Sequence, residues 1–76
     1  MNPVLVFDTT HHALWAEEIA LERGLAVQVI PAPPAAAARC DLALETLPED
    51  VEALTAALAA AGVAFRIYEG SGGPPQ

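Results

Sequence analysis

The order of the hydrophobic patterns along the chain constrains its fold most strongly. Short apolar runs typical of strands alternate with two longer segments of helical period, in the order strand, helix, strand, strand, helix, strand. A glycine follows each helical segment, as expected where a helix ends in the left-handed conformation. We therefore expect strands at residues 3–8, 26–31, 41–46 and 63–69, and helices at 11–23 and 48–61.

The first helix is expected to lie close to the sheet, because its apolar face carries small residues. Its orphan N–H groups can donate to one of three side chains just before it, those of Asp8, Thr9 and Thr10. Its predicted buried face consists of Ala13, Ala16, Ala20 and, on the flank, Ile19. Leu14 and Leu21 form a second apolar strip, which is either a subunit contact or a pair of surface leucines. Trp15 is expected to pack, or to half-cover a sheet edge.

The two middle strands have one inward face each. Val27 and Val29 share a face of the second strand, and Pro31 ends that strand because proline cannot donate a ladder hydrogen bond. Leu42 and Leu44 are the predicted inward residues of the third strand. The Ala/Pro tract between these strands could form one helical turn, which would be marginal without tertiary support.

The second helix opens with Pro48 at a first-turn position, where a missing N–H costs little. Its predicted buried stripe consists of Val51, Leu54, Leu58 and Ala61. The last strand is expected to place Phe65 and Ile67 inside and Arg66 outside.

This order of elements predicts an α+β fold of the ferredoxin-like βαββαβ type. Right-handed crossovers then give a four-stranded antiparallel sheet of order 4-1-3-2, with both helices on one face. A flavodoxin-like fragment is the alternative, but two helices are too few to cover both faces of a sheet. The open face makes a homodimer possible. Residues 1–69 are expected to form this single domain, and residues 70–76 have the composition of a flexible tail.

The charge and hydropathy exclude several classes of function. The 76 residues carry a net charge of −7 with three arginines and no lysine, so nucleic acid is not an expected partner. Polar residues or prolines interrupt every apolar run well before the ~20 residues of a membrane span, and the start lacks the basic region of a signal peptide. A single cysteine cannot form an internal disulfide. We expect a cytoplasmic protein with a free thiol.

Cys40 follows the second strand, and the predicted topology brings it to the sheet edge where the first helix begins. The candidate site at this edge consists of Cys40 with Thr9, Thr10, His11, His12 and Arg39. A helix N-terminus and nearby cationic side chains favour the thiolate, the form that attacks sulfur electrophiles. Cys40 is therefore a candidate nucleophile, with a thiol pKa expected below that of a free cysteine.

Other interpretations of the same residues stay open. Cys40 can be a small hydrophobic residue under a loop, and Asp41 beside it opposes thiolate formation. His11 and His12 can be ordinary first-turn residues, or can ligate a soft metal such as zinc together with Cys40. No phosphate loop, paired-carboxylate spacing or Ser/His/Asp set is present. No cofactor and no resident metal are expected.

Two segments, VFDTTHHALWAEEIALERGLAVQVIPAPP and RCDLAL, resemble the selenium/sulfur carrier protein-like family of small bacterial domains. The resemblance covers about residues 4–69. It implies a carrier rather than an enzyme, with Cys40 holding sulfur or selenium as a persulfide or a Cys-S-SeH adduct. His11 and His12 would polarise the adduct, and the acidic surface would meet a donor or acceptor protein. Family members usually carry Arg, two Ser and Gly where this chain has Pro34, Ala37, Ala38 and Asp41.

Two further functions remain as alternatives. One is a ferredoxin-like interaction or regulatory module that dimerises through its open sheet face and contacts a partner. The other is soft-metal binding by Cys40 with both histidines.

Overall fold

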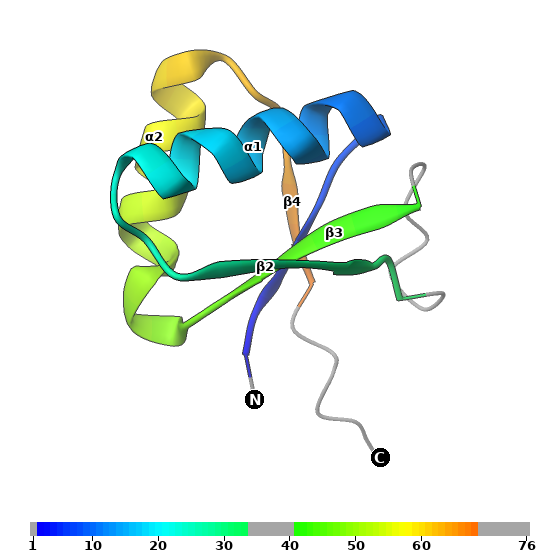
Figure 1. Ribbon diagram of the computed structural model, residues 1–76, viewed down its shortest axis with the longest axis horizontal. Helices are drawn as coiled ribbons and strands as arrows, with labels where there is room; N and C mark the ends of the chain where they lie inside the picture. Colours follow the sequence, from blue (N-terminus) through cyan, green and yellow to red (C-terminus); the bar gives the residue numbers. More distant parts are fainter. Residues whose placement is uncertain (1, 34–40, 69–76) are drawn as a thin grey trace.

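The computed structural model of the chain describes residues 2–33 and 41–68. Its elements follow the predicted order (Figure 1). They are β1 (Val4–Val6), α1 (Thr10–Glu22), β2 (Val27–Pro31), β3 (Leu42–Thr46), the 3₁₀ turn η2 (Pro48–Asp50), α2 (Val51–Ala61) and β4 (Arg66–Tyr68). The Ala/Pro tract and the predicted tail lie largely outside the described residues.

The four strands form one antiparallel sheet in the order β2-β3-β1-β4. This is the predicted order 4-1-3-2 counted from the opposite edge, so the ferredoxin-like arrangement is confirmed. Both helices pack against the same face of the sheet, as the shared hydrophobic cluster shows. None of the helices among the described residues is both long enough and apolar enough to cross a membrane.

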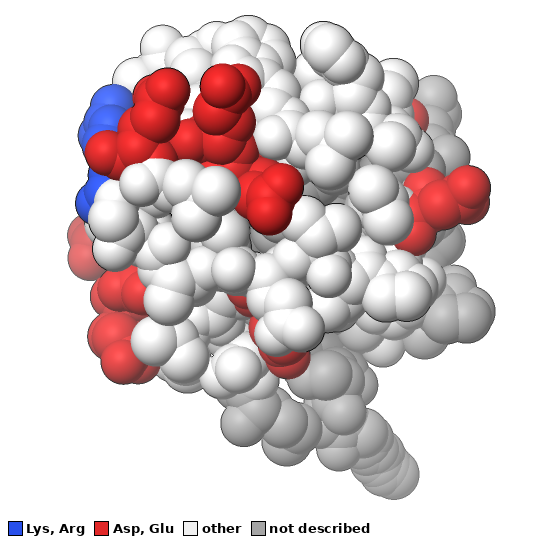
Figure 2. Space-filling view, viewed as in Figure 1, with Lys and Arg blue, Asp and Glu red and all other residues white. Residues whose placement is uncertain are grey.

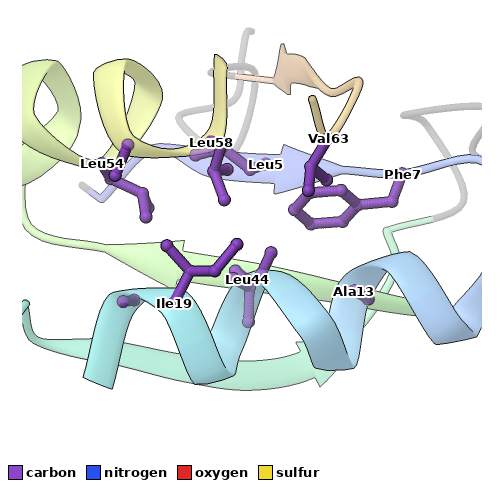
Figure 3. Packing of buried hydrophobic residues seen from close by; sticks show 11 residues of the cluster. Leu5, Phe7, Ala13, Ile19, Leu44, Leu54, Leu58 and Val63 are labelled. Carbon is purple, nitrogen blue, oxygen red and sulfur yellow. The ribbon is translucent and has the colours of Figure 1, made fainter. Parts of the chain in front are cut away.

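A row of four aligned residues crosses the sheet on the helix-covered face. Leu5 pairs with Leu44 on one side and with Ile67 on the other, and Leu44 pairs with Val29. Leu5 and Leu44 are fully buried at the centre of this row. Figure 3 shows Leu54 and Leu58 of α2 and Ile19 of α1 pointing into the same core. Their buried contributions are Ala13, Ala16, Ile19 and Ala20 from α1 and Leu54, Ala57 and Leu58 from α2.

Both helices end as predicted at glycines in the left-handed conformation. Gly24 follows α1 with φ +71°, and Gly62 follows α2 with φ +80°. The four residues predicted for the buried face of α1 are all buried. Pro48 starts η2, which leads directly into α2 and carries Glu49 and Asp50 at its start.

Several burial predictions were wrong. Trp15 is 40% exposed and belongs to neither hydrophobic cluster, and Val51 is only partly buried. Ala61 is exposed and Ala57 is buried in its place, because Ala61 is the last residue of α2, where the chain turns away toward β4. Ile67 aligns with Leu5 on the inner face but is 42% exposed, because β4 is an edge strand with a neighbouring strand on one side only. Phe65, just before β4, is partly buried against the core as expected.

The opposite face of the sheet carries a smaller hydrophobic cluster. Val4, Val6 and Ala43 are 3%, 2% and 0% exposed at its centre. The partly buried residues packed against them are Ile30, Ala32 and Tyr68. The sequence predicts an open face here, but the three residues at the centre of this face are buried. A homodimer through this face stays a prediction.

Candidate functional site

Three chain segments meet at the end of the sheet where β1 ends and β3 begins. We call this end of the strands the site edge, to distinguish it from the outer strands β2 and β4. The register Val6↔Ala43 places the end of β1 beside the start of β3, so Asp8 and Asp41 lie just beyond the last rung. The Ala32 N–H donates to the Asp41 carbonyl at 2.8 Å and extends the β2–β3 ladder to the same edge. Helix α1 begins here directly after β1, on the right of Figure 1.

Thr9 organises the first turn of α1. Its backbone is extended, with φ −140° and ψ 156°, and its Oγ1 accepts a hydrogen bond from the His12 N–H at 3.0 Å. Among the three predicted capping residues, Thr9 is thus the N-cap. The same Oγ1 lies 2.9 Å from Nδ1 of the His12 ring. A hydroxyl can accept the backbone N–H and donate its own proton to a ring nitrogen, so Thr9 holds both the helix end and the imidazole.

The two histidines form an edge-to-face pair at the start of α1. Their ring centroids are 6.3 Å apart, with an angle of 62° between the ring planes. His12 is partly buried beside Thr9, whereas His11 is exposed. The His11 side chain lines a surface depression of about 390 Å³ together with residues from the next two turns of the helix. One imidazole is therefore fixed by a hydrogen bond, and the other faces outward.

Four of the six predicted site residues come together in this turn: Thr9, Thr10, His11 and His12. Arg39 and Cys40 lie outside the described residues, so their part of the site stays a prediction. Within residues 2–33 and 41–68, no group of three or more His, Cys, Asp or Glu side chains could hold a metal ion. The proposed soft-metal set includes Cys40 and therefore also stays a prediction.

The sequence interpretation missed Arg66 as a residue of this edge. The register Val6↔Arg66 places the first residue of β4 beside the end of β1. A surface depression of about 230 Å³ lies there, lined among the described residues by Val6, Phe7, Asp8, Ala64, Phe65 and Arg66. The signal was available, because the last strand of a βαββαβ fold runs antiparallel to the first and must start where the first one ends.

Opposing charges meet at this edge. Asp8 and Asp41 are exposed carboxylates, and nearby negative charge disfavours a thiolate. The N-terminus of α1 and the exposed Arg66 guanidinium contribute positive potential. A thiol at this edge would therefore meet both kinds of charge, and the balance between them would determine its reactivity.

Comparison with known proteins gives one match. Residues 2–69 match the family described as "Putative Se/S carrier protein-like". No curated protein and no solved structure matches the chain significantly. The matched segment includes every described strand and helix, together with the first turn of α1 and Cys40. The chain therefore belongs to the Se/S carrier protein-like family.

Proposed function

We propose that this protein carries sulfur or selenium as an adduct on Cys40 and does not turn over a substrate of its own. Membership of the Se/S carrier protein-like family is the observation that carries the proposal. The position of Asp41 supports it, since Cys40 is bonded to Asp41, and Asp41 lies at the edge where α1 begins. The free thiol that this role needs is typical of a reducing compartment, so we assign the protein to the cytoplasm.

The proposed loading step is a transfer from a donor persulfide. The Cys40 thiolate attacks the outer sulfur of a donor R–S–SH, forming a new S–S bond as the donor S–S bond breaks. The donor leaves as the thiolate R–S⁻, and Cys40 becomes a persulfide. No external oxidant or reductant is needed, because one sulfur atom moves between two thiols. A donor R–S–SeH would transfer selenium in the same way.

In this proposal, the first turn of α1 stabilises the charged forms of Cys40. A helix N-terminus favours negative charge, and Thr9 keeps that terminus ordered through its bond to the His12 N–H. The imidazoles of His11 and His12 would donate hydrogen bonds to the persulfide, and Arg39 would add positive charge beside the thiol. Thr10 would supply a further hydroxyl at the same turn.

Intact mass spectrometry tests the proposal. Protein purified without reductant, or mixed with glutathione persulfide, should gain the mass of a sulfur atom that dithiothreitol removes. Cys40→Ser should gain none, and peptide mapping should locate the added sulfur on Cys40. The variant His11→Ala/His12→Ala should load more slowly and release its sulfur to small thiols more readily. A wild-type protein that takes up neither sulfur from glutathione persulfide nor selenium from a donor R–S–SeH would contradict the carrier role.

A protein-interaction module is a second candidate function, and the exposure of Leu14 and Trp15 favours it. Such a module would act through surface contacts alone. Cys40→Ser would then leave its function intact, whereas the same change would abolish the function of a carrier.

A further inference from the structure

The solvent-facing side of α1 carries three large apolar side chains, Leu14, Trp15 and Leu21, with Glu18 among them. His11, Leu14, Trp15 and Glu18 follow the spacing i, i+3, i+4 and i+7, so they share one helix face. Together they line the depression of about 390 Å³. Leu21 lies on the same face one turn further along the helix. This face points away from the buried alanines that pack on the sheet.

The large apolar side chains of this face are exposed to solvent. Leu14 is 47% exposed, Trp15 is 40% exposed and Leu21 is 61% exposed. Isolated exposed leucines are common, but Leu14 and Trp15 line the same depression and Leu21 shares their helix face, so the three form a patch. Trp15 is also of the residue type most enriched where binding energy concentrates in interfaces. We therefore consider which partner could cover this patch.

The charges around the patch indicate the chemistry of its partner. Glu18 and Glu22 are exposed and lie four residues apart, so two like charges stand on neighbouring turns. Glu22 also lies in the last turn of α1, next to the negative end of the helix dipole. Neither the pair of like charges nor the position of Glu22 stabilises α1. Figure 2 shows acidic side chains gathered over the C-terminal half of α1, with a basic side chain at the left edge of this group, beside an uncharged surface over the N-terminal half.

We propose that this face of α1 binds a basic amphipathic segment of another protein. An apolar side chain of that segment fills the depression beside Trp15, and its arginines or lysines pair with Glu18 and Glu22. A second copy of this chain is a poor occupant, because each copy carries a net charge of −7 and would present the same carboxylates to its partner.

The position of this face relates it to the candidate site. His11 lies in the depression and also in the first turn of α1, so a partner seated on Trp15 reaches the edge of the sheet described above. The proposal rests on described surface residues and needs no chemistry at Cys40. It names the surface by which a carrier would meet a donor or acceptor, and it holds equally for an interaction module.

Fluorescence of Trp15 provides the test, because it is the only tryptophan in the chain. The probe is a synthetic helical peptide with leucine along one face and lysine elsewhere. Two control peptides replace every lysine by glutamate or every leucine by serine. We expect the Leu/Lys peptide to shift Trp15 emission to shorter wavelength in a saturable, salt-sensitive titration, and both controls to bind at least about tenfold more weakly.

Matched variants separate specific docking from general attraction to an acidic protein. Glu18→Gln/Glu22→Gln on α1 and Glu49→Gln/Glu52→Gln on η2 and α2 remove the same charge from exposed positions. We expect the first pair to weaken binding about three- to tenfold and the second pair to leave it nearly unchanged. Leu14→Ser should also weaken it about fivefold.

Three results would overturn the proposal. The first is an equal loss of peptide affinity in both glutamine double variants. The second is equal affinity of the protein for the lysine and glutamate peptides. The third is a dimer of the free protein in sedimentation in which Trp15 is buried. The thiol-loading experiment is unaffected by any of them. Failure of docking and failure of the carrier role are therefore distinguishable.

Discussion

Replacing Thr9 by alanine should destabilise the whole domain by a predictable amount. The change removes the acceptor of the His12 N–H bond at 3.0 Å and the Oγ1···Nδ1 contact at 2.9 Å. Loss of a helix N-cap costs about 1 kcal/mol, within a range of about 0.5–2. The ring contact adds about 0.5–1 kcal/mol. With the typical value for the cap, the two losses add to a fall in the free energy of unfolding of about 1.5–2 kcal/mol.

Urea denaturation followed by circular dichroism measures this change. For a chain of 76 residues, each 1 kcal/mol lowers Tm by about 4–8 °C, so thermal scans should show a loss of about 6–16 °C. Thr9→Ser is the matched control. It keeps the hydroxyl oxygen and should lose less than about 0.5 kcal/mol, because serine caps helices at least as well as threonine.

A double-mutant cycle isolates the ring contact. His12→Ala alone removes the imidazole but keeps the backbone N–H bond, and the double variant Thr9→Ala/His12→Ala reports the coupling between the two side chains. A coupling of about 0.5–1 kcal/mol is expected. Equal stability of Thr9→Ala and wild type, or equal losses in Thr9→Ala and Thr9→Ser, would refute the assignment of Thr9 as the N-cap.

Two further predictions concern the core and the end of α2. Leu58→Ala should cost about 2–5 kcal/mol in urea denaturation because Leu58 is fully buried, whereas Leu21→Ala at a 61% exposed position should cost less than about 0.5. Equal losses of stability in these two variants would contradict the placement of Leu58 in the core. Gly62→Ala should cost about 1–2 kcal/mol in a thermal scan, because φ is +80° while no atom lies within 4 Å of an added Cβ. A neutral result would contradict the left-handed conformation there.

The topology was predictable because its signals are local. The switch from strand-like to helical patterns, and the glycines at 24 and 62, follow from neighbouring residues alone. The exposure of Ile67 was not predictable in this way. The predicted strand order already places the last strand at an edge of the sheet. The alternation of its residues, however, does not show how much of that strand's inner face stays open to solvent. Likewise, the choice between Ala57 and Ala61 depends on where α2 leaves the sheet.

The residues of the candidate site likewise differ in whether local sequence or long-range pairing determines their position. Consecutive residues such as Thr9 and His12 share a helical turn, so their proximity follows from predicting the helix. Arg66 reaches the edge only through the pairing of β4 with β1, which joins residues far apart in the sequence. The placement of Cys40 depends on the segment between β2 and β3, outside the described residues.

The central position of β1 also has a consequence for folding during synthesis. The ribosome makes β1 first, yet its two neighbours, β3 and β4, are made later, and β4 is the last of the described elements. The hairpin of β2 and β3 can pair early, because its strands are close in sequence. Until residues 66–68 emerge, one side of β1 has no strand to pair with. A nascent chain stalled before Arg66 should therefore expose unpaired backbone N–H and C=O groups of β1, which chaperones recognise.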